Sequence, residues 1–234
     1  MISPQPHDYR ELKIARRPTS DFAAEAIITG WRCWIFATTG IVLMLLLVQF
    51  LTGLLLAFYY VPSVDHAHTT VSFIEKVLPS GSWLRSLHHH GSQWLPLFLF
   101  LHIVQLFWRG VYRTRVARWL AAVVLLALVM AGGATGYSLP WDVRAFFSTR
   151  VAEGIVGGLP LIGVGAHNWL LGGGEISTLT LSRFYVLHVL VTPFLILMVI
   201  GWQLFRFQRN RICAAEENYS ASEQETVTRD ARRS

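Results

Sequence analysis

Two histidines in one apolar stretch stand at a spacing that suits the binding of two flat cofactors. His88 and His102 are 14 residues apart. In an α-helix of 3.6 residues per turn, 14 residues fall about 40° short of four full turns and rise about 21 Å. The two imidazoles are therefore predicted on one helix face at two depths. Imidazole is a standard axial ligand of haem iron, so this spacing indicates two haems stacked along a bundle.

A third histidine, His188, lies in another apolar stretch and is expected to enter the membrane from the same side as His88. Ionisable groups inside a bilayer are costly, so an intramembrane histidine marks a functional site by default. His88 and His188 are expected to clamp one haem near the outer face. The structural alternative for these two residues and His102 is interhelical hydrogen bonding. His89 and His90 point away from the face of His88 and are interpreted as interfacial contacts.

The apolar stretches predict an all-α membrane protein with four transmembrane helices. Of the 234 residues, 53% are hydrophobic and 15% are charged. A bilayer crossing needs ~20 apolar residues. The predicted spans are residues 35–58, 94–108, 119–136 and 184–205. The second span reaches the required length only if residues 91–93 begin it.

Basic residues gather on one side of these spans. They precede the first span, fill the connection between the second and third, and follow the fourth. They are Arg10, Lys13, Arg16, Arg17, Arg32, Arg109, Arg113, Arg115, Arg118, Arg206, Arg209 and Arg211. By the positive-inside rule, both termini are predicted on the cytoplasmic side. Nucleic-acid binding, the rival explanation of a net charge of +6, is disfavoured because the arginines flank apolar spans.

Three regions are expected along the chain. Residues 1–30 read as a cytoplasmic or interfacial segment, residues 31–208 as the four-helix domain, and residues 209–234 as a polar tail. Within the domain, the long connection 142–183 is expected to form outer loop helices that cover a pocket, because long loops in compact domains usually act as lids or binding elements. Pro193 predicts a kink in the fourth span.

Small and basic residues stand where a haem would need them. Gly53 in the first span and Gly136 in the third lie toward the outer side and would let the backbone approach a macrocycle. The alternative for both glycines is ordinary small-residue helix packing. Arg85, just outside the second span, is expected to pair with haem propionates through its planar guanidinium.

The chain resembles cytochrome b6, the N-terminal half of cytochrome b in bc-type quinol-oxidising complexes. The resemblance runs from about residue 31 to residue 207. It rests on QFLTG at Gln49–Gly53, RSLH at Arg85–His88, His102, GYSLPWD at Gly136–Asp142, LPLIG at Leu159–Gly163 and STLTLSRFYVLH at Ser177–His188. GYSLPW and RFYVLH at this separation make the resemblance specific.

The resemblance implies a bundle with haem b held between His88 and His188, and a quinol-oxidation pocket beside it. Its candidate pocket residues are Tyr137, Pro140, Trp141 and Phe146. The other half of the pocket is expected from a separate three-helix subunit with a PEWY-type motif, which this chain lacks. Further implied partners are a Rieske iron–sulfur protein, a cytochrome c-type subunit and membrane lipid, in a dimeric complex.

The sequence departs from this family at the inner haem. The family uses the residue matching His102 and a histidine 14 or 15 residues beyond the residue matching His188. Those positions hold Trp202 and Gln203, and no histidine follows His188. Pro193 matches the b6 type, which uses the longer of the two spacings and so points to Gln203.

Two further changes lie at the same inner site, where the family's glycine positions hold Thr39 and Ala122. Three interpretations stay open. In the first, an inner haem is bound by His102 alone or with a weak sixth ligand such as the Gln203 amide. In the second, the haem is absent and His102 forms a hydrogen bond in the bundle, for example to Gln203. In the third, a partner subunit supplies the missing ligand.

The b6 type also carries a haem attached to a cysteine near the start of the first span. That position matches Ala37 in this chain, and Cys33 lies one helical turn earlier.

The function predicted from these residues is electron transfer from membrane quinol as one subunit of a quinol:electron-acceptor oxidoreductase. Quinol is expected to give one electron to the Rieske protein and the other to the haem of His88 and His188. The alternatives are a haem-bearing anchor subunit for a different peripheral redox enzyme and a haem-free scaffold. A bacterial cytoplasmic membrane is the expected location, with a thylakoid-type membrane as the alternative.

Overall fold

A computed structural model describes residues 33–173, 175–206 and 208–209, and every regular element in these ranges is helical. The helices are α2 (Cys33–Ala57), α3 (Ala67–Lys76), α4 (Gly81–Trp108), α5 (Val111–Thr114), α6 (Val116–Ser138), α7 (Val143–Gly157), α8 (Gly163–Leu171), α9 (Thr178–Val186) and the π-helical turn η3 (Leu187–Val191). The segment expected at 1–30 and the tail expected at 209–234, apart from its first residue, lie outside the described residues and stay predictions.

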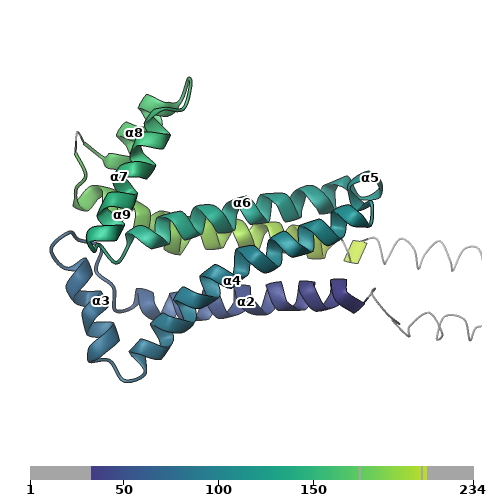
Figure 1. Ribbon diagram of the computed structural model, residues 1–234, viewed down its shortest axis with the longest axis horizontal. Coiled ribbons are helices and arrows are strands. Elements are labelled where there is room, and N and C mark those ends of the chain that lie inside the picture. Colours follow the sequence, from purple (N-terminus) through teal and green to yellow (C-terminus); the bar gives the residue numbers. More distant parts are fainter. Residues whose placement is uncertain (1–32, 174, 207, 210–234) are drawn as a thin grey trace, which may run out of the picture.

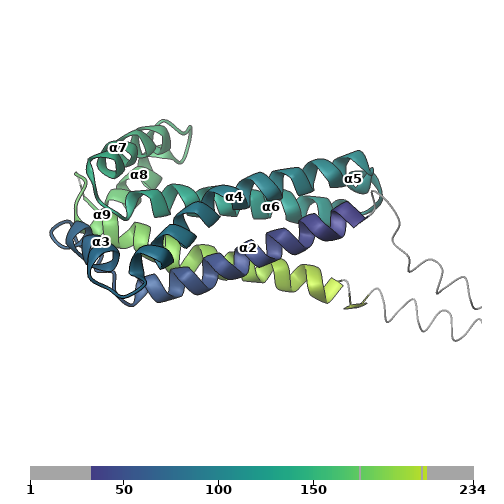
Figure 2. The ribbon, with the colours of Figure 1, turned by 60° about the horizontal axis from the view of Figure 1, so that its bottom comes forward.

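Long helices run side by side along the molecule (Figures 1 and 2). They are α2, α4, α6 and a fourth helix, Thr178–Arg206, which contains α9 and η3. The helices α3, α7 and α8 gather at one end of this bundle, and α5 lies at the other (Figure 1). The described chain enters and leaves at the α5 end, which also carries the arginines between α4 and α6. We refer to the α3–α7–α8 end as the outer end and to the α5 end as the inner end.

Three helices of the described residues are long and apolar enough to cross a membrane. They are Ala37–Ala57, Val116–Ser138 and Thr178–Arg206. The remaining long helix, α4, has 28 residues and so a length of about 42 Å. Its first half carries the polar run HHHGSQ, which lowers its mean hydropathy. The fourth crossing stays a prediction, supported by the packing of α4 against α2 and α6.

The bundle is apolar both inside and outside, as expected of helices surrounded by lipid. Its core cluster consists of Val42, Leu95, Leu99, Leu125 and Val129. Large apolar side chains also face outward, among them Met44 with 68% of its surface exposed and Phe194 with 60%. A soluble protein rarely exposes apolar surface on this scale.

The expected irregularity at Pro193 is present as a π-helical turn. The N–H of Thr192 bonds to Leu187 O, five residues earlier. Proline has no N–H, and in a regular α-helix its ring would meet the carbonyl of Val189, four residues before it. The wider π turn relieves this clash and adds one residue to the helix. Such turns often occur at functional sites, and this one contains His188.

The connection from α6 to the fourth helix folds into helices that lie over the outer end. Asp142 caps α7 by accepting a hydrogen bond from the Ala145 N–H at 2.7 Å. The buried Thr149 hydroxyl donates to Ser138 Oγ at 2.9 Å, which fixes α7 to the end of α6. These contacts hold the 139–142 turn in place.

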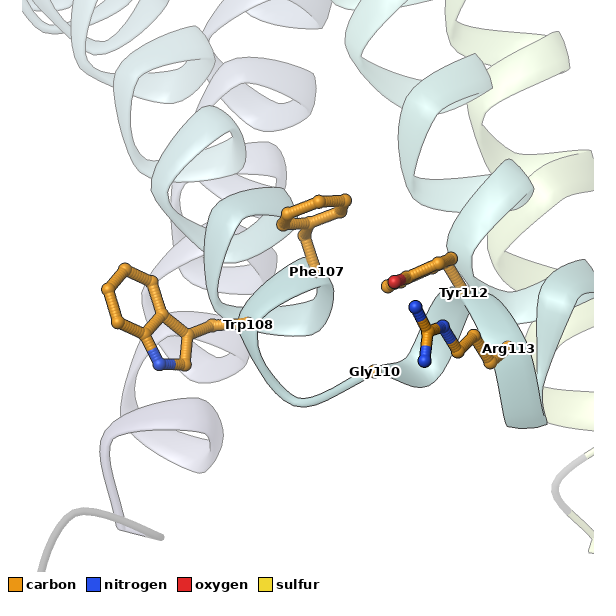
Figure 3. A pocket seen from close by; sticks show the side chains of 5 residues that line it. All are labelled: Phe107, Trp108, Gly110, Tyr112 and Arg113. Atoms are coloured by element: carbon orange, nitrogen blue, oxygen red, sulfur yellow. The ribbon is translucent and has the colours of Figure 1, made fainter.

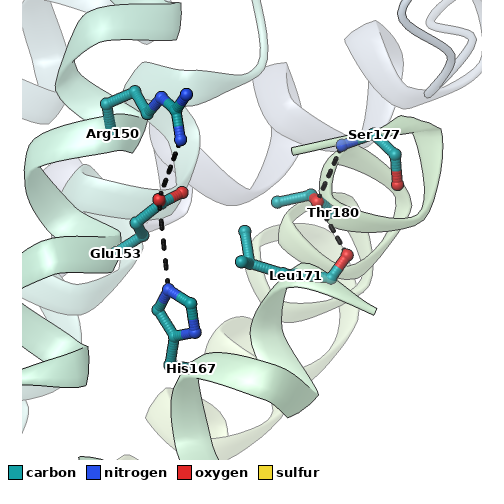
Figure 4. A network of polar contacts seen from close by, with 6 residues as sticks. All are labelled: Arg150, Glu153, His167, Leu171, Ser177 and Thr180. Carbon is teal, nitrogen blue, oxygen red and sulfur yellow. Dashed lines mark hydrogen bonds and ion pairs between the residues drawn. The ribbon is translucent and has the colours of Figure 1, made fainter. Parts of the chain in front are cut away.

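A second set of contacts joins α7, α8 and α9 (Figure 4). Glu153 accepts a hydrogen bond from Arg150 at 3.2 Å and has His167 Nε2 at 3.9 Å. The buried Thr180 hydroxyl donates to Leu171 O at 2.8 Å. The outer helices therefore form a packed layer rather than a loose loop.

Candidate functional site

His88 of α4 and His188 of η3 face each other inside the outer half of the bundle. Their ring centroids lie 6.0 Å apart and their planes are inclined by 81°. The two residues are far apart in the sequence, so only the packing of the bundle brings them together. Both side chains are partly buried.

The proton position on His188 follows from its hydrogen bond. Its Nδ1 lies 2.8 Å from Gly132 O in α6. A backbone carbonyl can only accept, so Nδ1 must donate its hydrogen. The lone pair of this imidazole is therefore on Nε2. A histidine that binds a metal through one nitrogen characteristically donates its other N–H to such an acceptor.

His88 is arranged in the same way on the other side. Its Nδ1 lies 3.0 Å from Thr52 Oγ1, and the Thr52 hydroxyl donates its own hydrogen to Val48 O at 2.6 Å. Because that hydrogen is already used, Thr52 accepts from Nδ1. His88 also presents a lone pair on Nε2. The two facing imidazoles are thus both prepared as Nε2 ligands.

Glycines make room for these two rings. A Cβ placed on Gly53 would come within 3.0 Å of His88 Cε1, and a Cβ on Gly136 would collide with the His188 ring. On the far side of His88, the Gln49 amide donates to His88 O at 3.0 Å. A Cβ on Gly91 would collide with that amide. The predicted glycines Gly53 and Gly136 therefore lie directly against the rings of His88 and His188.

These residues fit a haem iron. Metal–imidazole bonds are about 2 Å long, so two imidazoles on opposite sides of one ion have centroids about 6 Å apart. The observed separation of 6.0 Å agrees with that value. No group of three or more His, Cys, Asp or Glu side chains in the described residues could hold a bare metal ion. Two imidazoles with Nε2 lone pairs would suit a haem iron, which brings its remaining nitrogen ligands with it.

The arginine predicted to meet the haem carboxylates has another partner. Arg85 forms an ion pair with Glu75 of α3 at 2.8 Å. Arg85 as a haem contact stays a prediction. Arg183 of α9 has a buried Nη1 without a hydrogen-bond partner among the described residues, and its guanidinium lies against Gly172 and over the Trp169 ring at 5.5 Å.

The candidate pocket residues lie where α6 turns into α7. Trp141 and Phe146 are in edge contact, with centroids 6.1 Å apart, while Tyr137 is about half exposed. Trp141 has φ +51°, a left-handed conformation that is strained for a tryptophan and typical of functional turns. Pro140 lies between them and has no N–H to satisfy.

Tyr60 holds this turn against the rest of the bundle. Its hydroxyl donates to Leu139 O at 2.6 Å, and its ring stacks on Tyr185 at 5.5 Å. Burial, with a contribution from Tyr185, raises the pKa of Tyr60 well above its ordinary value. The hydroxyl therefore stays protonated as a donor at neutral pH.

His102 lies at the inner level and is 9% exposed. Its Nδ1 is 3.3 Å from Thr38 Oγ1, and the Thr38 hydroxyl donates to Gln105 Oε1 at 2.7 Å. The hydrogen bond from His102 to Gln203, one of the alternatives predicted from the sequence, is not among the hydrogen bonds of the described residues, in which Thr38 contacts Nδ1. Gln203 itself is half-buried.

A surface cavity of about 390 Å³ lies at the α4–α5 turn, at the inner end (Figure 3). Phe107 and Tyr112 stack at 5.0 Å, and Arg113 lies over the Tyr112 ring at 5.3 Å. Trp108 projects from the same turn and is 83% exposed. The cavity is at the opposite end of the bundle from the facing histidines.

Comparison with known proteins places this geometry in context. Residues 24–210 match the family model described as cytochrome b/b6/petB. A cytochrome b6 of Prochlorococcus marinus is 35% identical over 172 residues, covering 72% of this chain and 79% of that protein. A cytochrome b6 of Synechococcus elongatus is 34% identical, with coverages of 72% and 80%.

Among solved structures, a chain of a hyperthermophilic respiratory Complex III superposes with a TM-score of 0.68 and 20% sequence identity. The match covers 85% of the present chain and 54% of the other, so the present chain spans about half of that protein's length. This likeness confirms the predicted all-α membrane-subunit fold.

Proposed function

Because the chain belongs to the cytochrome b/b6 family, we propose that it is the haem-binding electron-transfer subunit of a membrane complex that oxidises quinol. Members of this family bind haem b and are integral membrane proteins of bacterial or thylakoid membranes. The observation that carries the proposal is the pair of facing imidazoles, His88 and His188, at 6.0 Å.

The roles of the residues around that pair follow from their hydrogen bonds. His88 and His188 are proposed to hold the iron through Nε2, while Thr52 and Gly132 O fix each ring by accepting from Nδ1. Haem b, when bound, supplies a one-electron carrier.

Arg85 is proposed to pair with the haem carboxylates, because a carboxylate matches the planar fork of arginine in geometry and charge. Its partner in the structure is Glu75, in an exposed ion pair at 2.8 Å, so the pairing requires this ion pair to open or to be shared. Arg183 has a buried Nη1 without a hydrogen-bond partner among the described residues, but it lies against Gly172 and Trp169 and about 140° around the helix from His188.

The quinol pocket is proposed at the α6–α7 turn. Trp141 and Phe146 offer flat apolar surfaces, and Tyr137 and Pro140 complete this side of the pocket. The hydrogen bond from Tyr60 to Leu139 O fixes the backbone that carries them. The other side is proposed to come from a separate subunit with a PEWY-type motif.

The remaining assignments concern the surroundings of the subunit. A Rieske iron–sulfur protein is the proposed acceptor of the first electron, with a cytochrome c-type subunit beyond it in a dimeric complex. The bacterial cytoplasmic membrane is the proposed location. The inner end with its arginines would face the cytoplasm, in agreement with the positive-inside rule.

The first prediction tests the axial pair. His88→Ala and His188→Ala are each expected to abolish the low-spin haem signal of the outer site, because one imidazole of the pair is lost. The measurement is the electron paramagnetic resonance spectrum of the intact complex, together with its reduced-minus-oxidised absorbance spectrum.

The neighbouring His89→Ala is the matched control. His89 is exposed and contacts Gln93 at 3.2 Å, so this variant should keep the full signal. In His188→Gly, added imidazole should restore the signal, which separates a lost ligand from a misfolded chain. A His188→Ala complex with an unaltered low-spin signal would refute the proposed ligation.

A further inference from the structure

The inner level of the bundle repeats half of the outer site at a fixed interval along two helices. On α4, His102 follows His88, and on α2, Thr38 precedes Thr52 by the same number of positions. The Nδ1–Oγ1 distance is 3.0 Å in the outer pair and 3.3 Å in the inner pair. Antiparallel helices with matched spacings bring both pairs into register.

The repeat extends to the direction of the hydrogen bonds. Thr38 donates its hydrogen to Gln105 Oε1, as Thr52 donates its own to Val48 O. Thr38 can therefore only accept from His102 Nδ1. The inner imidazole is left with its lone pair on Nε2, as the outer ligand is.

His102 Nε2 has no hydrogen-bond partner among the described residues, although the side chain is only 9% exposed. The residues one turn to either side, Leu99 and Leu106, are buried and apolar. The hydrogen bond that leaves the lone pair of His88 on Nε2 is thus repeated at His102, between two buried apolar side chains.

The opposite half of the outer site is not repeated. The π turn at Leu187–Val191 adds one residue to the fourth helix. The 14-residue interval found on α2 and α4 would place the inner equivalent of His188 at Trp202. With the added residue of the π turn, the equivalent position is Gln203. Exposure agrees, because Gln203 is half-buried while Trp202 is 44% exposed and has Arg206 over its ring at 5.3 Å.

Helix α6 also differs between the outer and the inner level. Gly136 has no side chain because the His188 ring lies against it. The residue at the same interval toward the inner end of α6 is Ala122, which is buried with 4% exposure. A methyl group fits at this level because no imidazole arrives from residue 203. On α2, the position equivalent to Gly53 at the inner level holds Thr39. The Nδ1–Oγ1 distance is also longer in the inner pair, His102 and Thr38, than in the outer pair.

We propose that the inner level binds an iron porphyrin through His102 alone, leaving the second axial position open to a small neutral ligand such as carbon monoxide. This inference rests on the proposed function. An amide oxygen is a poor ligand for ferrous iron, which prefers imidazole over carbonyl oxygen. Gln203 therefore leaves the position exchangeable, whereas the outer iron is closed by two imidazoles.

The test uses the intact complex purified from membranes. Its haem content per chain is measured as the pyridine haemochrome, its spin states by electron paramagnetic resonance, and ligand binding by the carbon monoxide difference spectrum of the reduced form. The expected result is two haems per chain, one low-spin and inert and the other high-spin and reactive with carbon monoxide.

Three variants locate the open position. His102→Leu should remove the carbon monoxide-reactive haem and leave the low-spin signal intact. Gln203→His should convert the reactive haem to low-spin and abolish carbon monoxide binding. Trp202→His is the matched control and should leave both signals unchanged, because residue 202 lies off the face of His188.

Each result bears on the proposal. A single low-spin haem per chain would overturn the inner site and leave the proposed function standing. Two low-spin haems would overturn the open coordination, since a sixth ligand would then be present. Loss of carbon monoxide binding in Trp202→His but not in Gln203→His would overturn the register. Absence of any low-spin haem would refute the proposed function itself.

Discussion

At the scale of single residues, the site depends on which nitrogen of each histidine carries the hydrogen and on the lack of a side chain at the neighbouring glycines. Gly132 O and Thr52 Oγ1 accept from the Nδ1 atoms of His188 and His88, and this leaves the lone pair of each ring on Nε2, the atom proposed to bind iron. Gly136 lies against the His188 ring. The imidazole can keep its position only because that residue has no side chain.

The second prediction concerns this glycine. Gly136→Ala is expected to displace the His188 ring and to deplete the outer haem, because the new methyl group would overpack the site at a cost of about 1–3 kcal/mol. The measurement is haem content per chain at equal protein level in the membrane. Gly133→Ala is the control, since a Cβ there would meet nothing within 4 Å. Equal haem content in both variants would contradict the role of Gly136.

At the scale of elements, the fourth helix is the part that departs from regular geometry. Pro193 cannot donate an α-helical hydrogen bond, and the turn before it is the π turn Leu187–Val191. One irregular turn thus contains His188 and shifts by one residue the register of the fourth helix beyond it.

The third prediction concerns Pro193. Pro193→Ala restores a backbone N–H, so the turn can return to α-helical bonding and the His188 ring should rotate. We expect haem to be retained but the low-spin resonance and the reduction midpoint potential of the outer haem to shift. Thr178→Ala, at the far end of the same helix, provides a comparison outside the irregular turn. An unaltered resonance in Pro193→Ala would mean that tertiary packing, and not the proline, maintains the π turn.

At the scale of the whole molecule, the outer layer and the bundle are joined by a few long-range contacts. Tyr60 follows α2, yet its hydroxyl bonds to Leu139 O at the end of α6 and its ring stacks on Tyr185 of α9. Ser182 Oγ bonds to Pro62 O nearby. These contacts hold the proposed quinol pocket in position relative to the facing histidines.

The fourth prediction concerns Tyr60. Tyr60→Phe removes one hydrogen bond, worth about 0.5–1.5 kcal/mol, while the stacked ring is kept. We expect slower quinol oxidation with an unchanged haem spectrum, because the pocket turn loosens while the ligands stay in place. The readouts are the turnover rate of the complex and its reduced-minus-oxidised spectrum. Tyr59→Phe should leave both unchanged, because the Tyr59 side chain is 45% exposed; a rate loss there as large as in Tyr60→Phe would contradict the prediction.

The sequence by itself determined the helical membrane fold and the family, and it pointed to the histidines that we propose as iron ligands. Apolar length and the spacing of His88 and His102 are local properties of the chain, and they depend only on helix geometry. The absence of a second histidine after His188 is likewise read directly from the sequence.

Only the tertiary structure decided which groups those histidines meet. Gly132 O is a backbone atom and leaves no sequence signal. The contacts of Thr38 and Arg183 are made to other helices, and their partners depend on how the helices pack. The ion pair of Arg85 with Glu75 likewise came from the packing of α3 on α4. The physical reason is that hydrogen bonds between helices depend on their relative rotation and height, which are set by packing and not by the periodicity of any one segment.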